Sequence, residues 1–138
     1  MSDTNATTVD LERLGGEEGI ARWVQRFYEK VEREPVLAPM FEDLERARTR
    51  QFDYFVEIFG GPRRYTEQYG RPFLRFKHRR FRIGQAERDA WMRLVIEALR
   101  EVGTEEAVVQ AVEQRLAAIA DAMINTHPER QDAYYFQR

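Results

Sequence analysis

The 138-residue sequence contains no cysteine. This absence excludes disulfides, zinc–thiolate sites, iron–sulfur clusters and cysteine nucleophiles. A chain without cysteine is typical of a reducing compartment. Since the polar, acidic stretch 1–10 also lacks the pattern of a signal peptide, we expect a cytoplasmic protein.

The sequence also lacks long apolar runs and a strong net charge. No stretch approaches the roughly 20 apolar residues that a membrane span requires. The 22 basic and 24 acidic side chains leave a formal net charge of -2, which gives no general attraction to nucleic acid or anionic membranes. We therefore expect neither nucleic acid nor a membrane as a partner.

Proline and glycine are scarce and stand mainly between segments with helical periodicity. Apolar residues recur at helical spacing over 17–34, 44–58 and 85–102, and again in a last helix that extends to about Ile124. Gly103 is placed to end the third helix and Thr104 to cap the last one. The sequence thus predicts an all-α domain over 11–126, with a flexible extension at 1–10 and a polar tail at 127–138.

The stretch 62–84 is different, because it follows the breaker Gly60-Gly61-Pro62 and shows little periodicity. We expect a loop there with one or two short helical turns. A long irregular segment inside a small domain is usually functional.

Two histidines are candidates for chemistry. His78 lies inside the irregular segment, and His127 begins the tail, where a solvated role is favoured. From composition alone a surface role is the more frequent one for His78, although histidine is also a common metal ligand.

Three further polar side chains interrupt apolar helical stripes. Tyr28 and Trp91 are compatible with simple core packing, with their O–H and N–H requiring partners. Gln51 requires more, since unpaired buried amide groups cost about 1–3 kcal/mol. Water, a tyrosine or a ligand should therefore meet it.

The irregular segment carries a basic run. It contains Arg71, Arg75, Lys77, Arg79, Arg80 and Arg82. No nucleic-acid-binding motif accompanies it, which favours a solvated face or a rim that pairs with acidic groups. A P-loop, G-x-S-x-G, H-E-x-x-H and E-x-x-H are all absent, which argues against the corresponding nucleotide, hydrolase and metal sites.

A longer ordered pattern resembles the truncated haemoglobins, in particular their second group. The pattern comprises Leu14-Gly15-Gly16 with Phe27-Tyr28; Gly60-Gly61-Pro62 with Tyr65, Glu67, Gly70 and Pro72; Leu74-Arg75 with His78, Phe81 and Ile83; and Glu87-Arg88-Asp89-Ala90-Trp91. The resemblance implies a two-over-two helical sandwich with haem between the helix pairs. The sequence departs from the family pattern at Arg71, where histidine is usual, and at Arg79-Arg80, where Ala-Pro is common.

The resemblance also implies roles for individual residues. His78 falls on the proximal ligand of the haem iron, and with no cysteine the haem b would be held non-covalently. The distal, ligand-facing positions are Tyr28, Gln51, Trp91, Phe41 and Ala47. The remaining haem contacts would be Arg50, Phe55, Tyr65, Leu74, Lys77, Phe81 and Val95, with Arg50 as a partner for a propionate.

The implied function is reversible binding of O₂, NO and CO, or O₂ transport. Several distal hydrogen-bond donors favour strong retention and hence redox chemistry, detoxification or sensing, such as nitric oxide dioxygenase or peroxidase-like activity. Such turnover would require a reductase, which the sequence does not identify, and either a monomer or a homodimer is compatible. The alternative is a haem-free globin-like module that acts through protein contacts.

Overall fold

The computed structural model describes residues 9–126, so the predicted tail, including His127, and most of the N-terminal extension lie outside the described residues. Within 9–126 the chain forms helices and turns and no strand. The elements are η1 (Glu12–Leu14), α2 (Gly16–Val31), η2 (Ala38–Met40), α3 (Leu44–Ile58), α4 (Arg64–Tyr69), α5 (Leu74–Lys77), α6 (Gln85–Glu101) and α7 (Glu106–Met123). None of these helices is long and apolar enough to cross a membrane.

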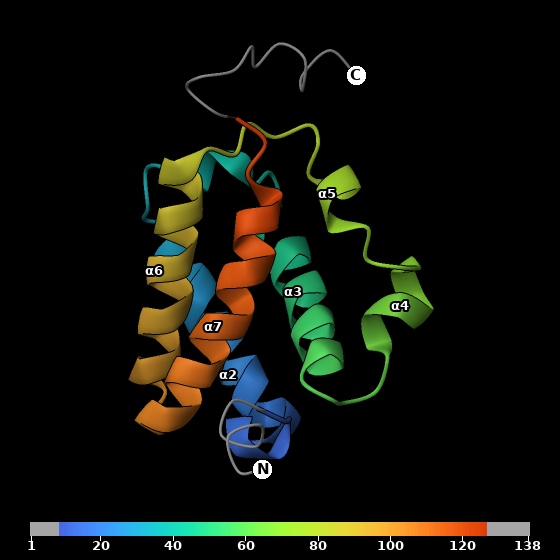
Figure 1. Ribbon diagram of the computed structural model, residues 1–138, viewed down its shortest axis with the longest axis vertical. Helices are drawn as coiled ribbons and strands as arrows, with labels where there is room; N and C mark the ends of the chain where they lie inside the picture. Colours follow the sequence, from blue (N-terminus) through green and yellow to red (C-terminus); the bar gives the residue numbers. More distant parts are fainter. Residues whose placement is uncertain (1–8, 127–138) are drawn as a thin grey trace.

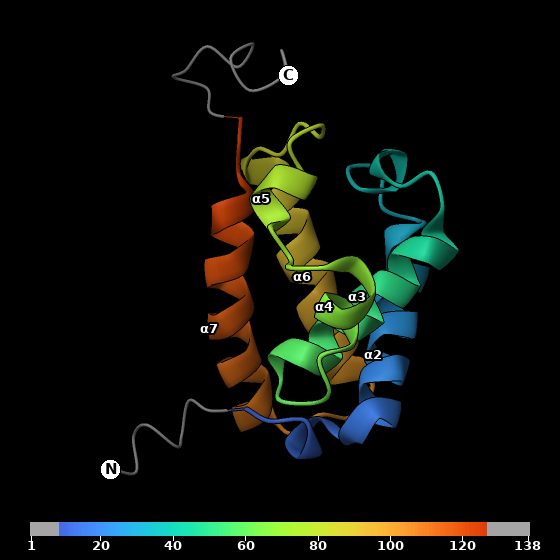
Figure 2. The same ribbon diagram turned by 90° about the vertical axis from the view of Figure 1, so that its right-hand side faces the viewer.

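Two helix pairs make up the body of the molecule. Helix α2 packs against α3 in one pair, α6 packs against α7 in the other, and α2 also packs against α6 (Figures 1 and 2). This arrangement confirms the predicted all-α, two-over-two sandwich. The short helices α4 and α5 lie to one side, where α4 contacts α3 and α5 contacts α7.

Trp23 joins three of the four long helices. Its indole N–H donates to the carbonyl oxygen of Val95 on α6 at 2.8 Å, and its ring stacks on Phe55 of α3 with centroids 4.6 Å apart. All three residues are almost completely buried. Truncating a buried aromatic side chain of this size costs about 3–5 kcal/mol, so Trp23 contributes a large part of the stability of the core.

The turn between α6 and α7 confirms one predicted cap and corrects the other. Gly103 has a φ of 91° and donates to the carbonyl of Arg100, while the Thr104 N–H reaches the carbonyl of Leu99 at 3.4 Å. These two bonds form a Schellman motif. Thr104 therefore belongs to the end of α6, and the predicted cap at Thr104 is wrong: α7 is preceded by Glu105, with no side-chain cap.

Gly19 permits the close approach of η1 to α2. A Cβ built on Gly19 would lie 1.9 Å from the carbonyl oxygen of Leu14, a distance that no side chain can adopt without a backbone shift. This position therefore requires glycine because there is no room for a Cβ, although alanine is the better helix former by about 1 kcal/mol.

We predict that Gly19→Ala destabilises the protein by about 2 kcal/mol or more, because relieving the clash must displace η1. Gly84→Ala is the control, since a Cβ there meets only ordinary contacts at 3.4 Å. Urea unfolding of both variants measures the difference. Equal stabilities would contradict the close packing of η1 on α2.

Candidate functional site

His78 follows the single helical turn α5 and is fixed by a hydrogen bond to that turn. Its Nδ1 lies 2.7 Å from the carbonyl oxygen of Leu74. Because a carbonyl oxygen only accepts, Nδ1 must carry the hydrogen, and in the neutral imidazole Nε2 then holds the free lone pair. No residue within 9–126 forms a hydrogen bond with Nε2. The ring is thus oriented as a histidine that binds a metal through Nε2.

The irregular segment around His78 contains two short helices, α4 and α5, as the sequence predicts. Its start is held by Glu57, whose carboxylate accepts the Thr66 N–H at 2.8 Å and the Thr66 hydroxyl at 2.5 Å. Its end is held by Asn125 beyond α7. The Asn125 side chain accepts the Ile83 N–H at 2.9 Å and donates to the Phe81 carbonyl at 2.9 Å.

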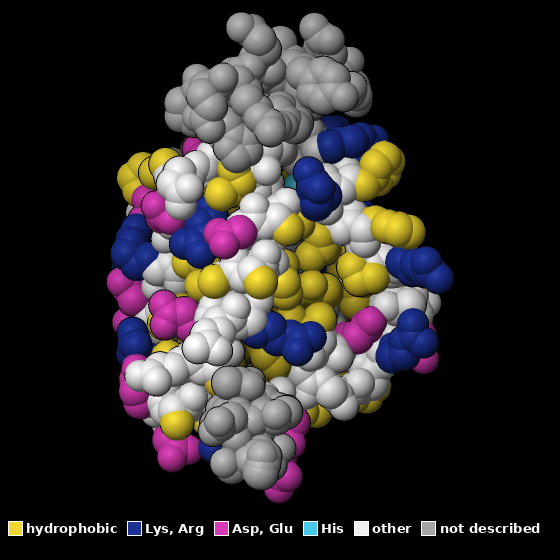
Figure 3. Space-filling model, viewed as in Figure 1, with side chains coloured by type: hydrophobic (Ala, Val, Ile, Leu, Met, Phe, Trp, Pro, Cys, Tyr) yellow, Lys and Arg dark blue, Asp and Glu magenta, His cyan; other side chains and the backbone are white. Residues whose placement is uncertain are grey.

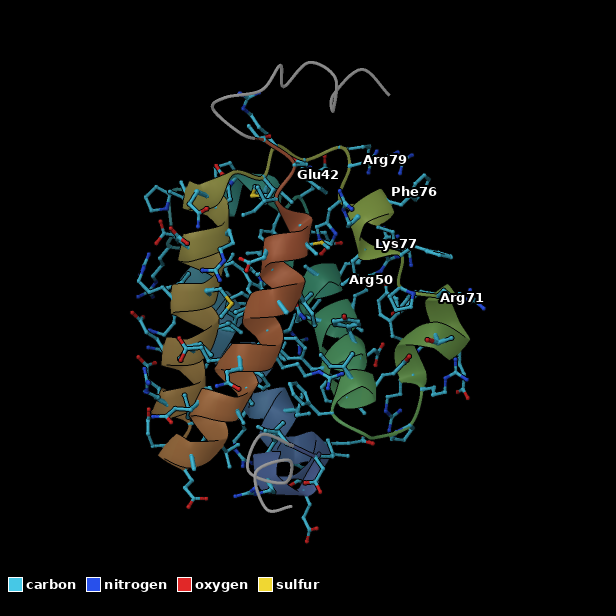
Figure 4. The ribbon with its side chains drawn as sticks, viewed as in Figure 1. Glu42, Arg50, Arg71, Phe76, Lys77 and Arg79 are labelled. Carbon is cyan, nitrogen blue, oxygen red and sulfur yellow. The ribbon has the colours of Figure 1, made fainter. Side chains whose placement is uncertain are left out.

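Two cationic side chains, Arg50 and Lys77, contact different parts of Tyr69 between α3 and the α4–α5 segment. The Arg50 guanidinium lies 4.7 Å from the centre of the Tyr69 ring, and the Lys77 ammonium lies 3.5 Å from the Tyr69 carbonyl oxygen. Lys77 also donates to the Tyr65 hydroxyl at 3.0 Å and to the Arg71 carbonyl at 3.1 Å. Figure 4 shows Arg50 and Lys77 between α3 and the two short helices, where they can pair with an acidic group.

On the other side of the helical sandwich, Tyr28 of α2 meets Gln51 of α3. The Tyr28 hydroxyl donates to Gln51 Oε1 at 3.3 Å, so the amide predicted to need a partner has a tyrosine. Phe41 lies perpendicular to the Tyr28 ring, with centroids 5.7 Å apart. Burial raises the pKa of the Tyr28 phenol well above its usual value of 10, and the group therefore stays protonated and able to donate.

Trp91 of α6 lies beside this tyrosine pair. The Phe27 ring contacts Trp91 edge-on at 5.7 Å and Tyr28 at 4.8 Å, and so connects the two. The Trp91 indole N–H has no hydrogen-bond partner in the part of the chain that the structure describes, and its side chain is only half-buried. Ala47 is half-buried against the same core. This group therefore holds an indole donor that is free for a ligand.

The other predicted contacts fall into two sets. Phe81 lies beside His78, with ring centroids 6.3 Å apart, and Leu74 is half-buried at the start of α5. Phe55 and Val95 belong to the buried core around Trp23. Figure 3 shows hydrophobic side chains in the recess between α7 and the α4–α5 segment.

Several residues with a part in this arrangement were not identified from the sequence. Trp23 could have been found, since it lies four residues before Phe27 on the apolar stripe of α2. Asn125 gave no signal, because its contacts with Ile83 and Phe81 span more than 40 residues. Asp53 is the one buried charged residue within 9–126, and it accepts hydrogen bonds from Gln68 and Tyr69 at 3.3 Å each.

Comparison with known proteins gives one consistent family. The family model for bacterial-like globins matches residues 11–125. The group 2 truncated haemoglobin YjbI of Bacillus subtilis (strain 168) is 36% identical over 111 residues, which covers 80% of this chain and 84% of that protein.

Solved structures agree. The group II truncated haemoglobin of Bacillus anthracis superposes with a TM-score of 0.83 at 34% identity, covering 88% of this chain and 95% of that one. A truncated oxygen-avid haemoglobin from Bacillus subtilis gives a TM-score of 0.77 at 36% identity, covering 80% and 94%. The fold and these matches together show that the chain belongs to the bacterial-like globin family, within the truncated haemoglobins of group II.

Proposed function

We propose that this globin binds O₂, and also NO and CO, reversibly at a haem iron held by His78. The observation that carries the proposal is the bond from His78 Nδ1 to the Leu74 carbonyl, which fixes the tautomer and leaves Nε2 for the iron. Haem supplies an iron with one further coordination position, at which a diatomic ligand can bind.

The residues around His78 fit a flat apolar group with acidic edges. The recess between α7 and the α4–α5 segment is lined by hydrophobic side chains, and Arg50 and Lys77 lie at its rim, where they would pair with propionates. Tyr65, Leu74 and Phe81 would contact the haem on the His78 side, and Phe55 and Val95 would contact it from the core. The absence of cysteine excludes thioether attachment of the haem, and we propose that haem b is held non-covalently.

Three donors would stabilise a ligand on the distal side. The Trp91 N–H has no protein partner within 9–126, and Gln51 uses only its oxygen in the bond to Tyr28. The Tyr28 hydroxyl can rotate from Gln51 to the ligand. Each hydrogen bond to a charged acceptor contributes about 1–3 kcal/mol, so two effective donors slow ligand release by roughly two to four orders of magnitude.

Slow release suits redox chemistry or sensing better than transport. We propose a cytoplasmic role in ligand detoxification, such as nitric oxide oxidation or peroxide-dependent turnover, with a separate reductase. The relative from Bacillus subtilis that is described as oxygen-avid supports tight ligand retention.

We predict that the purified chain with added haemin gives a Soret band and a ferrous CO spectrum. His78→Gly should lose the histidine-ligated ferrous spectrum and regain it when imidazole is added, because free imidazole replaces the missing ligand. His127→Ala is the control and should behave like the unmodified chain. A chain that takes up no haem would instead support the haem-free interaction module.

We predict that Tyr28→Phe and Trp91→Phe each raise the O₂ dissociation rate by about 10- to 100-fold, the kinetic equivalent of one lost hydrogen bond. Stopped-flow displacement of O₂ by CO measures the rate. Tyr54→Phe is the control, since this tyrosine lies outside the distal group and should change the rate less than about twofold. An unchanged rate in both distal variants would rule out the donor model.

We predict that the Tyr28 phenol does not ionise below about pH 11, since burial raises its pKa above the usual 10. The difference in absorbance at 295 nm between the unmodified chain and Tyr28→Phe should stay flat from pH 8 to 11. A phenolate signal with a midpoint near pH 10 would contradict the burial of this hydroxyl.

A further inference from the structure

The outer side of α5 exposes aromatic and basic side chains together. We name this surface the outer α5 patch. It consists of Arg71, Phe73, Arg75, Phe76, Arg79 and Arg80. Phe73 and Phe76 are each 62% exposed, the highest values among the exposed large hydrophobic residues within 9–126. Figure 4 shows Arg71, Phe76 and Arg79 on the side of this segment that faces away from α7.

Within the part of the chain that the structure describes, the outer α5 patch keeps its positive charge. No acidic residue occurs from Gln68 to Ala86, although the whole chain has a net charge of -2. Arg71, Arg75, Arg79 and Arg80 form no ion pair with any carboxylate within 9–126, whereas Arg93 pairs with Glu34 at 2.7 Å. Figure 3 shows dark blue and yellow side chains over α5.

The Phe76 ring is held in place by Arg79 rather than by burial, and the Phe73 backbone is strained. The Arg79 guanidinium lies 3.8 Å from the centre of the Phe76 ring, and it donates to the Phe76 carbonyl at 2.8 Å. Phe73 has a φ of 39°, in the left-handed region that costs a bulky residue about 1–3 kcal/mol. An exposed ring regains little of that cost by packing in the folded chain, so the strain points to a use outside it.

We propose that the outer α5 patch is the docking surface for an acidic electron-transfer protein that reduces the haem iron. Aromatic residues, including phenylalanine, and arginine are enriched at protein interfaces, and guanidinium groups pair with carboxylates in a bidentate manner. The patch belongs to the same short segment as His78, so a donor docked on it lies beside the haem site. This proposal rests on the proposed function, because it assigns a partner to that site.

Two other classes of partner fit the patch less well. A nucleic acid or a membrane surface is usually bound by a long basic or amphipathic helix, and α5 has only four residues.

The redox step itself is simple. One electron passes from a reduced iron–sulfur cluster to ferric iron, which oxidises the cluster and forms ferrous iron without proton transfer.

The first test measures binding to a plant-type [2Fe–2S] ferredoxin, a small acidic one-electron donor, by anisotropy of a fluorescent label on the ferredoxin. The variant Arg71→Gln/Arg75→Gln should weaken binding about tenfold at low salt. The control Arg33→Gln/Arg46→Gln changes the net charge by the same amount, using exposed arginines without ion pairs within 9–126. It should weaken binding less than about twofold.

The second test concerns the aromatic part of the patch. Phe76→Ser should weaken ferredoxin binding, and Val36→Ser, which alters an exposed apolar residue on the α2–α3 connection, should not. The second-order rate of haem reduction by reduced ferredoxin should fall in parallel with affinity, whereas reduction by dithionite should remain unchanged in every variant.

The outcomes separate the two proposals. Absence of a Soret band would defeat the proposed function, and ferredoxin binding can still be measured by anisotropy without haem. Equal binding of the patch and control variants would overturn the docking surface. Binding to phosphatidylglycerol vesicles or to an oligonucleotide that depends on Phe76, without binding to ferredoxin, would also overturn it.

Discussion

The hydrogen bond from the Trp23 indole to the Val95 carbonyl is the contact on which the rest of the structure depends. It joins α2 to α6 inside the core, and the stack on Phe55 adds α3 to the same point. A buried donor left without an acceptor costs about 1–3 kcal/mol. The way in which α2 crosses α6 is therefore fixed by the geometry of this hydrogen bond as well as by packing. Phe27 lies one turn further along α2, and Tyr28 follows it. The position of the distal group is therefore set by this contact.

The two sides of the site are built by different means. On one side, long helices place Tyr28, Gln51 and Trp91 through close packing of aromatic rings and a hydrogen bond. On the His78 side there is little helix, and hydrogen bonds to backbone carbonyls and N–H groups perform the same task. Core packing thus fixes the first group of side chains, whereas the His78 side consists of short elements held by a few hydrogen bonds.

Periodicity and turn residues were sufficient to predict the long helices, the irregular segment and the Gly103 cap, because these features depend on local sequence. The Thr104 cap was wrong because α7 begins at Glu106, so that Glu105 and not Thr104 precedes it, and no side chain caps the helix. Trp23 was not identified because it lies within an apolar stripe, and its hydrogen-bond partner Val95 is 72 residues away in the sequence. The haem-contact roles of Phe55 and Val95 stay predictions, as do the iron-ligand role of His78 and the distal roles. The hydrogen bonds from Asn125 to Ile83 and Phe81 could not be predicted, because they depend on tertiary proximity alone.

The hydrogen bonds that tether the segment around His78 have a consequence for the thermodynamics of cofactor binding. Glu57 and Asn125 hold the two ends of the segment that carries His78, which makes it a closed loop rather than a free arm. Fixing one residue of a flexible backbone costs about 1–2 kcal/mol, and a loop tethered at both ends has fewer conformations to lose. The two tethers therefore reduce the conformational entropy that this segment loses when it becomes ordered. A smaller entropy loss leaves more of the favourable contact energy for affinity.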